Sequence, residues 1–273
     1  MSIWNAIFFG FVQGLTEYFP VSSSAHLSVL GNLFGVMDNG YNFQMFTVFT
    51  HFGTVMAVLI SFWKDITDMV YQIIMMRSGT DPRRRYSSVR LLYMIFLSSL
   101  PLIMVVPFNK NLNVLFYNNI IIGVMLILNG TALFISRKIS GGNKSETNMT
   151  QTDALVVGVS QIVGAIPGIS RVGVAMSGGI AIGLNKDFAL KYAYLLSVPA
   201  ALGVNIIHLI DSTVMGFEWS YLPSFLIGMV VSMLTGIATI RIMKNLVKNN
   251  RTGGFAYYSW VAGFLFIILT MIF

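Results

Sequence analysis

The sequence of 273 residues contains no cysteine, and only 10% of its residues are charged. The absence of cysteine excludes disulfides, thiolate metal sites and cysteine nucleophiles, so any chemistry must use oxygen and nitrogen groups, with or without a hard metal ion. The chain is also 55% hydrophobic, with a mean hydropathy of +0.74. It therefore has too little polar surface to cover a soluble globule of this length, and we predict an integral membrane protein.

Six apolar runs have about the length of roughly 20 residues that a helix needs to cross a bilayer. They are residues 43–62, 91–108, 120–135, 192–210, 221–240 and 255–273. The fold class that we predict is an all-α integral membrane protein with about six transmembrane helices. The N-terminal stretch has no basic start and continues into a polar motif, so we expect it to be retained and not cleaved as a signal peptide.

Lysine and arginine gather between alternate predicted spans. The three groups are Lys64, Arg77, Arg83, Arg84, Arg85 and Arg90; Arg137, Lys138 and Lys144; and Arg241, Lys244, Lys248 and Arg251. The positive-inside rule places these loops in the cytoplasm, so the loops around residues 109–118 and 211–220 and the chain end at Phe273 are expected outside. Membrane orientation thus explains the net charge of +7, and we expect no nucleic-acid partner.

Two segments of similar pattern lie in the two halves of the chain, one from Gly10 to Ser23 and one from Gly158 to Ser170. Each reads Gly-x-x-Gln, a short apolar run, proline and then serine, and each precedes three predicted spans. The spans that follow them run in opposite directions. We therefore predict one membrane domain of residues 1–273 that holds an inverted repeat, with halves of about 1–138 and 152–273.

Neither of these segments can cross a membrane as one regular helix. Residues 3–34 are broken at Pro20 and residues 154–184 around Pro167, which leaves pieces too short to span. Irregular backbone at membrane depth is tolerated only when it is buried in protein or lines a wet cavity. We predict two re-entrant helix hairpins, the first entering from outside and the second from the cytoplasm, whose tips meet near mid-membrane. The alternative, a kinked helix that spans once, would upset the alternation of loop charge.

Ionisable side chains inside the hydrocarbon are costly unless paired or hydrated, so each is a functional hypothesis. Only Glu17 and Arg171 lie deep in apolar segments. Arg171 follows Gly168 and Ser170 at the expected mouth of a short helix, where backbone amides, a hydroxyl and a guanidinium suit a phosphate anion. The alternative is that Arg171 only neutralises Glu17 across the interface of the two halves.

Glu17 precedes Pro20, and three serines at 22–24 and then His26 follow it. The carboxylate can serve as a base or a metal ligand, and a serine hydroxyl can serve as a nucleophile. The imidazole can serve as an acid, a base or a nucleophile. The serines could instead only cap a helix, and His26 could be a satisfied buried polar residue. His51 lies mid-span in the next helix, where we expect it to support the site.

Residues 13–26 and 167–171 resemble the two motifs of the undecaprenyl-diphosphate phosphatases of the bacitracin-resistance type, and the similarity covers nearly the whole chain. The resemblance implies hydrolysis of a polyprenyl diphosphate to the monophosphate, which recycles the carrier lipid for cell-wall synthesis and confers bacitracin resistance. It further implies a bacterial cell membrane, a site open to the outer side, a homodimer, contact with membrane lipids, and help from a divalent cation such as Mg²⁺ or Ca²⁺ without an organic cofactor.

The resemblance also assigns roles to individual residues. The residues expected to be catalytic are Glu17, Ser23, His26 and Arg171, and Glu17 is also the expected metal ligand. The residues expected to contact substrate are Gln13, Ser22, His51, Gly168, Ser170 and Arg171.

Three positions depart from the family pattern. Gln13 stands where many members have a first glutamate, and Val172 and Ala175 stand where hydroxyl residues are usual. The alternative function is a transporter or flippase of polyprenyl phosphate or another lipid phosphate, because secondary transporters also build their sites from inverted repeats with broken helices.

Overall fold

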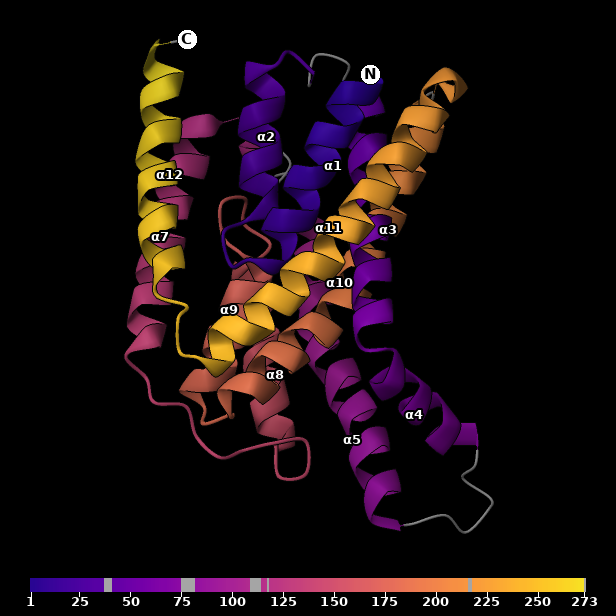
Figure 1. The fold of residues 1–273 in the computed structure, drawn as a ribbon, viewed down its shortest axis with the longest axis vertical. Helices are drawn as coiled ribbons and strands as arrows, with labels where there is room; N and C mark the ends of the chain where they lie inside the picture. Colours follow the sequence, from indigo (N-terminus) through magenta and orange to yellow (C-terminus); the bar gives the residue numbers. More distant parts are fainter. Residues whose placement is uncertain (37–40, 75–81, 109–113, 117, 216–217, 273) are drawn as a thin grey trace.

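The computed structural model describes residues 1–36, 41–74, 82–108, 114–116, 118–215 and 218–272. Within these ranges the chain is helical (Figure 1). The helices are α1 (Ile3–Tyr18), α2 (Ser23–Leu33), α3 (Tyr41–Ser61), α4 (Trp63–Ile74), α5 (Pro82–Ser99), the 3₁₀ helix η3 (Leu100–Phe108), α7 (Asn119–Arg137), α8 (Gln151–Val163), α9 (Arg171–Ala181), α10 (Lys186–Met215), the 3₁₀ turn η4 (Trp219–Tyr221), α11 (Leu222–Lys248) and α12 (Gly254–Ile272).

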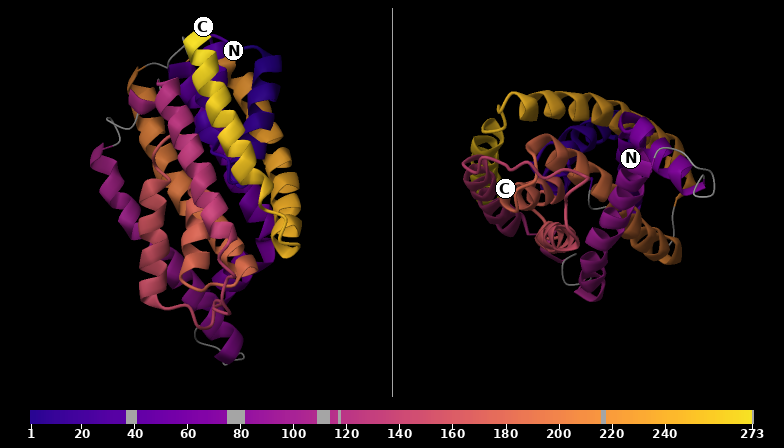
Figure 2. Two further views of the ribbon diagram at one scale, coloured as in Figure 1. Left: turned by 90° about the vertical axis from the view of Figure 1, so that its left-hand side faces the viewer. Right: turned by 90° about the horizontal axis from the view of Figure 1, so that it is seen from below.

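Six segments are long and apolar enough to cross a membrane, which confirms the predicted fold class. They are Asn42–Ser61, Ser88–Phe108, Asn119–Arg137, Lys186–Leu209, Trp219–Lys248 and Gly254–Ile272. Each one overlaps one of the six predicted apolar runs. Figure 2 shows the long helices side by side in one bundle.

Four short helices form two antiparallel pairs, α1 with α2 and α8 with α9. In Figure 1 the first pair lies in the half of the bundle near both chain termini, and the second pair lies in the opposite half. The first pair turns through Ser22, whose φ of 65° is rare for a residue with a side chain, and the second through Gly168, whose φ is 98°. That these pairs enter a membrane without crossing it stays a prediction.

The first helix of each pair packs against the second span of the other half. A Cβ atom on Gly10 of α1 would lie 2.6 Å from the backbone oxygen of Gly228 in α11. A Cβ atom on Gly158 of α8 would lie 2.5 Å from the backbone oxygen of Ser98 in α5. The glycine of each Gly-x-x-Gln pattern therefore permits a backbone contact that no larger residue allows. The likeness of the two segments thus has a matching structural basis.

Two elements differ from the predicted arrangement. The basic stretch after the first span, predicted as a loop, contains α4, an amphipathic helix that begins at Trp63 with Lys64 and Asp65 in its first turn and exposes Val70. Such a helix suits a membrane surface, and its short length hides it from a search for spans. The second predicted span ends as the 3₁₀ helix η3, where two prolines remove backbone donors.

Part of the predicted orientation falls on residues that are not described. Arg77 in the first basic group, residues 109–113 of one predicted outer loop, residues 216–217 of the other, and Phe273 lie outside the described residues.

Candidate active site

A small polar cavity lies where the tips of the two helix pairs meet. Its volume is about 50 Å³, room for a few water molecules or a group of that size. The lining residues are Thr16, Glu17, Ser22, Ser23, Ser24, His51, Gly164, Ile169, Ser170, Arg171 and Val172. The fold thus gathers most of the predicted site residues from α1, α2, α3 and α9 into one place.

The Glu17 carboxylate is the centre of the hydrogen bonds in this cavity. Its Oε2 atom accepts a hydrogen bond from the Ser23 hydroxyl at 2.6 Å and another from the Gln13 amide at 3.0 Å. The Gln13 Oε1 atom is buried and has no hydrogen-bond partner in the described part of the chain. A serine hydroxyl held by a carboxylate is the arrangement of a nucleophile and its base.

His51 is the third group that reaches Glu17. Its Nδ1 atom lies 2.8 Å from the Thr47 carbonyl oxygen, which can only accept, so Nδ1 carries a proton. The Nε2 atom lies 3.8 Å from Glu17 Oε2. A second proton on Nε2 would therefore give an ion pair with Glu17, and this placement agrees with a supporting role for His51.

Two helices begin at the cavity with capped N-termini. Ser22 caps α2 by accepting from the Ala25 amide at 3.4 Å, and Ser170 caps α9 by accepting from the Gly173 amide at 3.1 Å. The N-terminus of a helix carries a partial positive charge and unpaired amides, so two converging N-termini attract an anion.

Arg171 adds a full positive charge at the start of α9. Its Nε atom is buried without a hydrogen-bond partner in the described residues. None of the ion pairs formed by these residues joins Arg171 to a carboxylate, although Glu17 lines the same cavity. The guanidinium is therefore not engaged in an ion pair and can bind an anion through its planar set of N–H donors.

The two positions that lack the hydroxyl groups usual in the family differ in their surroundings. Val172 lines the cavity, so the cavity wall lacks a hydroxyl at this position. Ala175 is 2% exposed and lies in the core formed by α9 and α10. The loss at Ala175 therefore leaves the cavity wall unchanged.

Three predicted site residues do not line the cavity: Gln13, which reaches it only through its hydrogen bond to Glu17, His26 and Gly168. His26 donates from Nδ1 to the Ser22 carbonyl oxygen at 2.8 Å, and its Nε2 atom accepts from the Tyr258 hydroxyl at 2.7 Å. Both ring nitrogens are thus engaged, on the side of α2 that faces α12. Gly168 packs against α7, where an added Cβ atom would lie 2.5 Å from the Met125 Cβ.

Asn129 of α7 connects the two tips, and the sequence reading missed it. Its amide donates to the Pro20 carbonyl oxygen at 2.9 Å, and its Oδ1 atom accepts from the Ser170 backbone amide at 3.0 Å. The side chain is 2% exposed. One sequence feature could have identified it: Asn129 is the single asparagine in the apolar run 120–135, and a side-chain amide inside a span is expected to form a hydrogen bond to another segment.

We expect Asn129→Leu to reduce the activity of this site by about 10- to 100-fold. The change leaves a buried carbonyl and a buried amide without partners, which costs about 1–3 kcal/mol and frees the two tips to move apart. Thermal unfolding and turnover would be measured together. The control is Asn32→Leu, which breaks a 2.9 Å bond between Asn32 and Asn119 at the start of α7, away from Asn129 in the middle of the helix. Equal activity loss in both variants would show that Asn129 only stabilises the fold.

Comparison with known proteins identifies the family of this chain. Residues 6–265 match the family described as bacitracin resistance protein BacA. A protein of Halothermothrix orenii is 34% identical over 273 residues and one of Alkaliphilus metalliredigens is 33% identical over 277 residues, with all of each chain covered. One of Methanosphaera stadtmanae is 31% identical over 281 residues, covering 100% of this chain and 99% of the relative. All three are named undecaprenyl-diphosphatase. The chain therefore belongs to the BacA family of bacitracin resistance proteins.

Proposed function

We propose that this protein is a membrane phosphatase that hydrolyses undecaprenyl diphosphate to undecaprenyl phosphate and inorganic phosphate. Two relatives that match this chain over their full length are named undecaprenyl-diphosphatase. The observation that carries the proposal is a serine–carboxylate pair that faces an arginine and two helix N-termini in one cavity. The activity would recycle the carrier lipid for cell-wall synthesis, and it would confer bacitracin resistance.

Binding of the terminal phosphate is the first step. Arg171 and the first-turn amides of α2 and α9 hold its oxygens, because these are the positive groups that line the cavity. The same groups are already in place when negative charge develops on phosphorus, so they stabilise the transition state without reorganising.

Ser23 is the proposed nucleophile. Its Oγ atom attacks the terminal phosphorus and its proton passes to Glu17, while the bond from phosphorus to the bridging oxygen breaks. Glu17 gives that proton to the departing undecaprenyl phosphate. A water molecule then attacks the phosphoserine and gives a proton to Glu17, which returns it to Ser23 as inorganic phosphate leaves. Ser23 is preferred to His26 because both nitrogens of His26 are engaged outside the cavity.

An apolar groove of about 300 Å³ fits the polyprenyl chain of this substrate. Arg171 lines the groove as well as the polar cavity, so the two are joined at its side chain. The rest of the groove comes from residues such as Phe96 and Ile103 on one side and Pro199 and Ile207 on the other. Apart from Phe96, the groove residues from these two spans lie in the halves that the charge pattern assigns to the outer side. We therefore place the substrate in the outer leaflet of the cell membrane.

A divalent cation would fit this cavity only with help from the substrate. No group of three histidine or acidic side chains that could hold a metal occurs in the described ranges. Glu17 and the unpartnered Oε1 atom of Gln13 are the oxygen ligands that would hold Mg²⁺ or Ca²⁺, with phosphate oxygens and water completing the shell. When bound, the ion would neutralise charge on the diphosphate.

The inverted repeat, with halves of about 1–138 and 152–273, is part of the same proposal, supported by the matched contacts of Gly10 and Gly158. A homodimer is proposed on the resemblance alone.

Phosphate release from undecaprenyl diphosphate by the purified protein in detergent tests the function. We expect one phosphate per substrate molecule and none from undecaprenyl phosphate, and we expect a chelator to slow release if the cation takes part. In sealed liposomes, redistribution of a labelled lipid phosphate without phosphate release would contradict the proposal and favour a flippase.

A further inference from the structure

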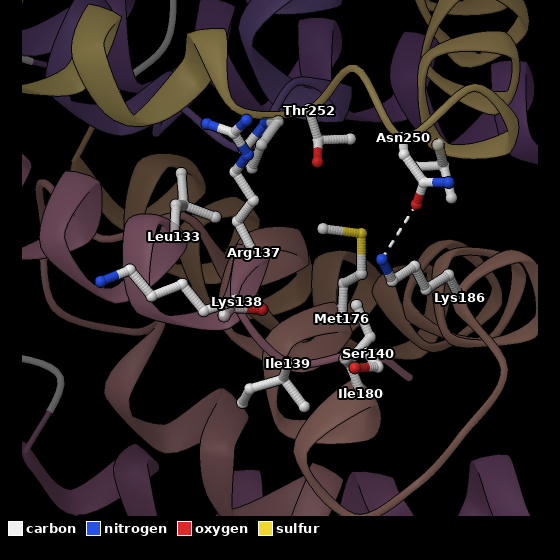
Figure 3. A pocket seen from close by; sticks show the side chains of 13 residues that line it. Leu133, Arg137, Lys138, Ile139, Ser140, Met176, Ile180, Lys186, Asn250 and Thr252 are labelled. Atoms are coloured by element: carbon white, nitrogen blue, oxygen red, sulfur yellow. Dashed lines mark hydrogen bonds between the residues drawn. The ribbon is translucent and has the colours of Figure 1, made fainter. Parts of the chain in front are cut away.

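A third cavity, of about 440 Å³, lies away from the candidate active site (Figure 3). Its walls come from the end of α7, the end of α9, the start of α10 and the connection between α11 and α12. Among the described residues before Leu133, Pro20 at the tip of the first helix pair is the one that lines this cavity. Neither Glu17 nor Arg171 lines it, so it is a separate site.

The walls of this cavity are positively charged. Arg137, Lys138 and Lys186 line it, and no aspartate or glutamate does. In Figure 3 the side chains of Arg137 and Lys186 stand on two sides of the opening with Met176 between them. Lys138 contributes less, because its ammonium group lies 5.0 Å from the centre of the Phe134 ring and points away from the cavity. The charge of the site therefore rests on Arg137 and Lys186.

Neutral contacts hold these two cations in position. Lys186 donates to the Asn250 side-chain oxygen at 2.9 Å, and Arg137 lies against the Gly253 backbone, where an added Cβ atom would be 2.6 Å from its Nη1 atom. The ion pairs among the described residues involve other cations, Lys144, Lys191 and His51. Asp187, next to Lys186 along the chain, lines a different pocket. The two charges thus face the cavity without a neutralising carboxylate.

The cavity has the polarity of a lipid headgroup site. Arg137 ends one span, Lys186 begins another, and Asn250 and Thr252 lie between two more, so the polar mouth is at the membrane edge. The positive-inside rule assigns this edge to the cytoplasm. The floor is apolar and includes Met176. A cavity with cations at the cytoplasmic membrane edge and apolar residues deeper inside suits a lipid whose anionic headgroup contacts the cations and whose acyl chain contacts the apolar residues.

We propose that this cavity binds a phosphate group at the cytoplasmic edge of the membrane, held by Arg137 and Lys186. The group belongs either to an anionic phospholipid or to free inorganic phosphate, and the two share the oxyanion that the cations recognise. The binding is independent of the proposed hydrolysis, because neither cation lines the polar cavity of Glu17 and Arg171.

The test uses the full-length Arg171→Ala protein in detergent, so that binding at the candidate active site is weakened. One arm measures inorganic phosphate by equilibrium dialysis, and the other measures retained phosphatidylglycerol by native mass spectrometry. Adding Arg137→Gln and Lys186→Gln is expected to weaken binding by about 30-fold, since each cation near a membrane surface contributes about five- to tenfold. Retention in either arm identifies the source of the phosphate.

Three variants keep the outcome interpretable. Lys244→Gln removes one charge on the same side of the membrane but outside the cavity, where its ammonium lies over the Phe62 ring, and should bind normally. Arg137→Lys with Lys186→Arg keeps both charges and changes only the geometry of the donors, so it should bind more tightly than the glutamine pair. If the glutamine pair unfolds, Thr252→Glu, which places an acid in the mouth, should still abolish binding. No binding in either arm, or equal binding by the glutamine pair, would overturn the proposal.

Discussion

Arg171→Ala is expected to lower kcat/KM for undecaprenyl diphosphate by about 1,000-fold. An arginine that stabilises the charge of a phosphoryl transition state is typically worth about 1,000-fold or more in rate. Here the guanidinium lines the cavity without a carboxylate partner, and the cavity lining contains no lysine and no other arginine. The measurement is phosphate release at several substrate concentrations, with thermal unfolding to confirm that the variant is folded.

Arg171→Lys is the informative companion. It keeps the charge but loses the planar fork, so we expect an activity between those of the native protein and the alanine variant. Arg251→Ala, on the exposed connection between α11 and α12, removes the same side chain far from the cavity and should be fully active. Full activity of Arg171→Ala would mean that the reaction takes place elsewhere in the molecule.

Ser23→Ala is expected to lower kcat by at least about 1,000-fold with little change in KM. Removal of a nucleophile abolishes the covalent step and leaves only binding and electrostatic stabilisation. The hydroxyl of Ser23 lies 2.6 Å from Glu17 Oε2, which makes it the best activated hydroxyl in the cavity. Glu17→Gln should lower kcat by about 100- to 10,000-fold, as expected for removal of a general base. Initial rates of phosphate release would measure both.

Ser24→Ala is the matched control for Ser23. The neighbouring hydroxyl lines the same cavity, but it bonds the Ser22 hydroxyl at 3.1 Å and not the carboxylate. We expect a loss of less than about tenfold, since a hydrogen bond between neutral groups contributes about 0.5–1.5 kcal/mol. Trapping of a phosphorylated Ser23 by rapid acid quench would support the covalent route. Equal losses at both serines would argue for water as the direct nucleophile.

The sequence predicted the parts of this protein that depend on composition and on local pattern. Six spans follow from the length of apolar runs, and the bilayer imposes that length. Glu17 and Arg171 line one cavity. Their proximity could be predicted because charged side chains deep in a membrane are expected to be functional, and because the two similar segments were expected to meet at their tips. Both inferences use rules that hold whatever the tertiary packing.

Side-chain direction could not be predicted in the same way. Ser23 and His26 lie within one turn of α2, yet Ser23 faces Glu17 while His26 faces Tyr258 of α12, a contact across 232 residues. Asn129 was missed for a similar reason, because its partners Pro20 and Ser170 come from both halves. Which way a helix face turns depends on partners that local sequence does not reveal.

The crossed packing of the two halves has a consequence for biogenesis. Since α1 packs on α11 through Gly10 and Gly228, the first helix pair at first contacts α3 and α7 of its own half, and the neighbour on the Gly10 face of α1 follows more than 200 residues later. The N-terminal half on its own would leave uncovered the backbone of α1 around Gly10, which α11 of the second half covers. Ribosomes that stall before α11 should therefore leave a nascent chain that membrane proteases recognise, and coexpressed halves should accumulate only together.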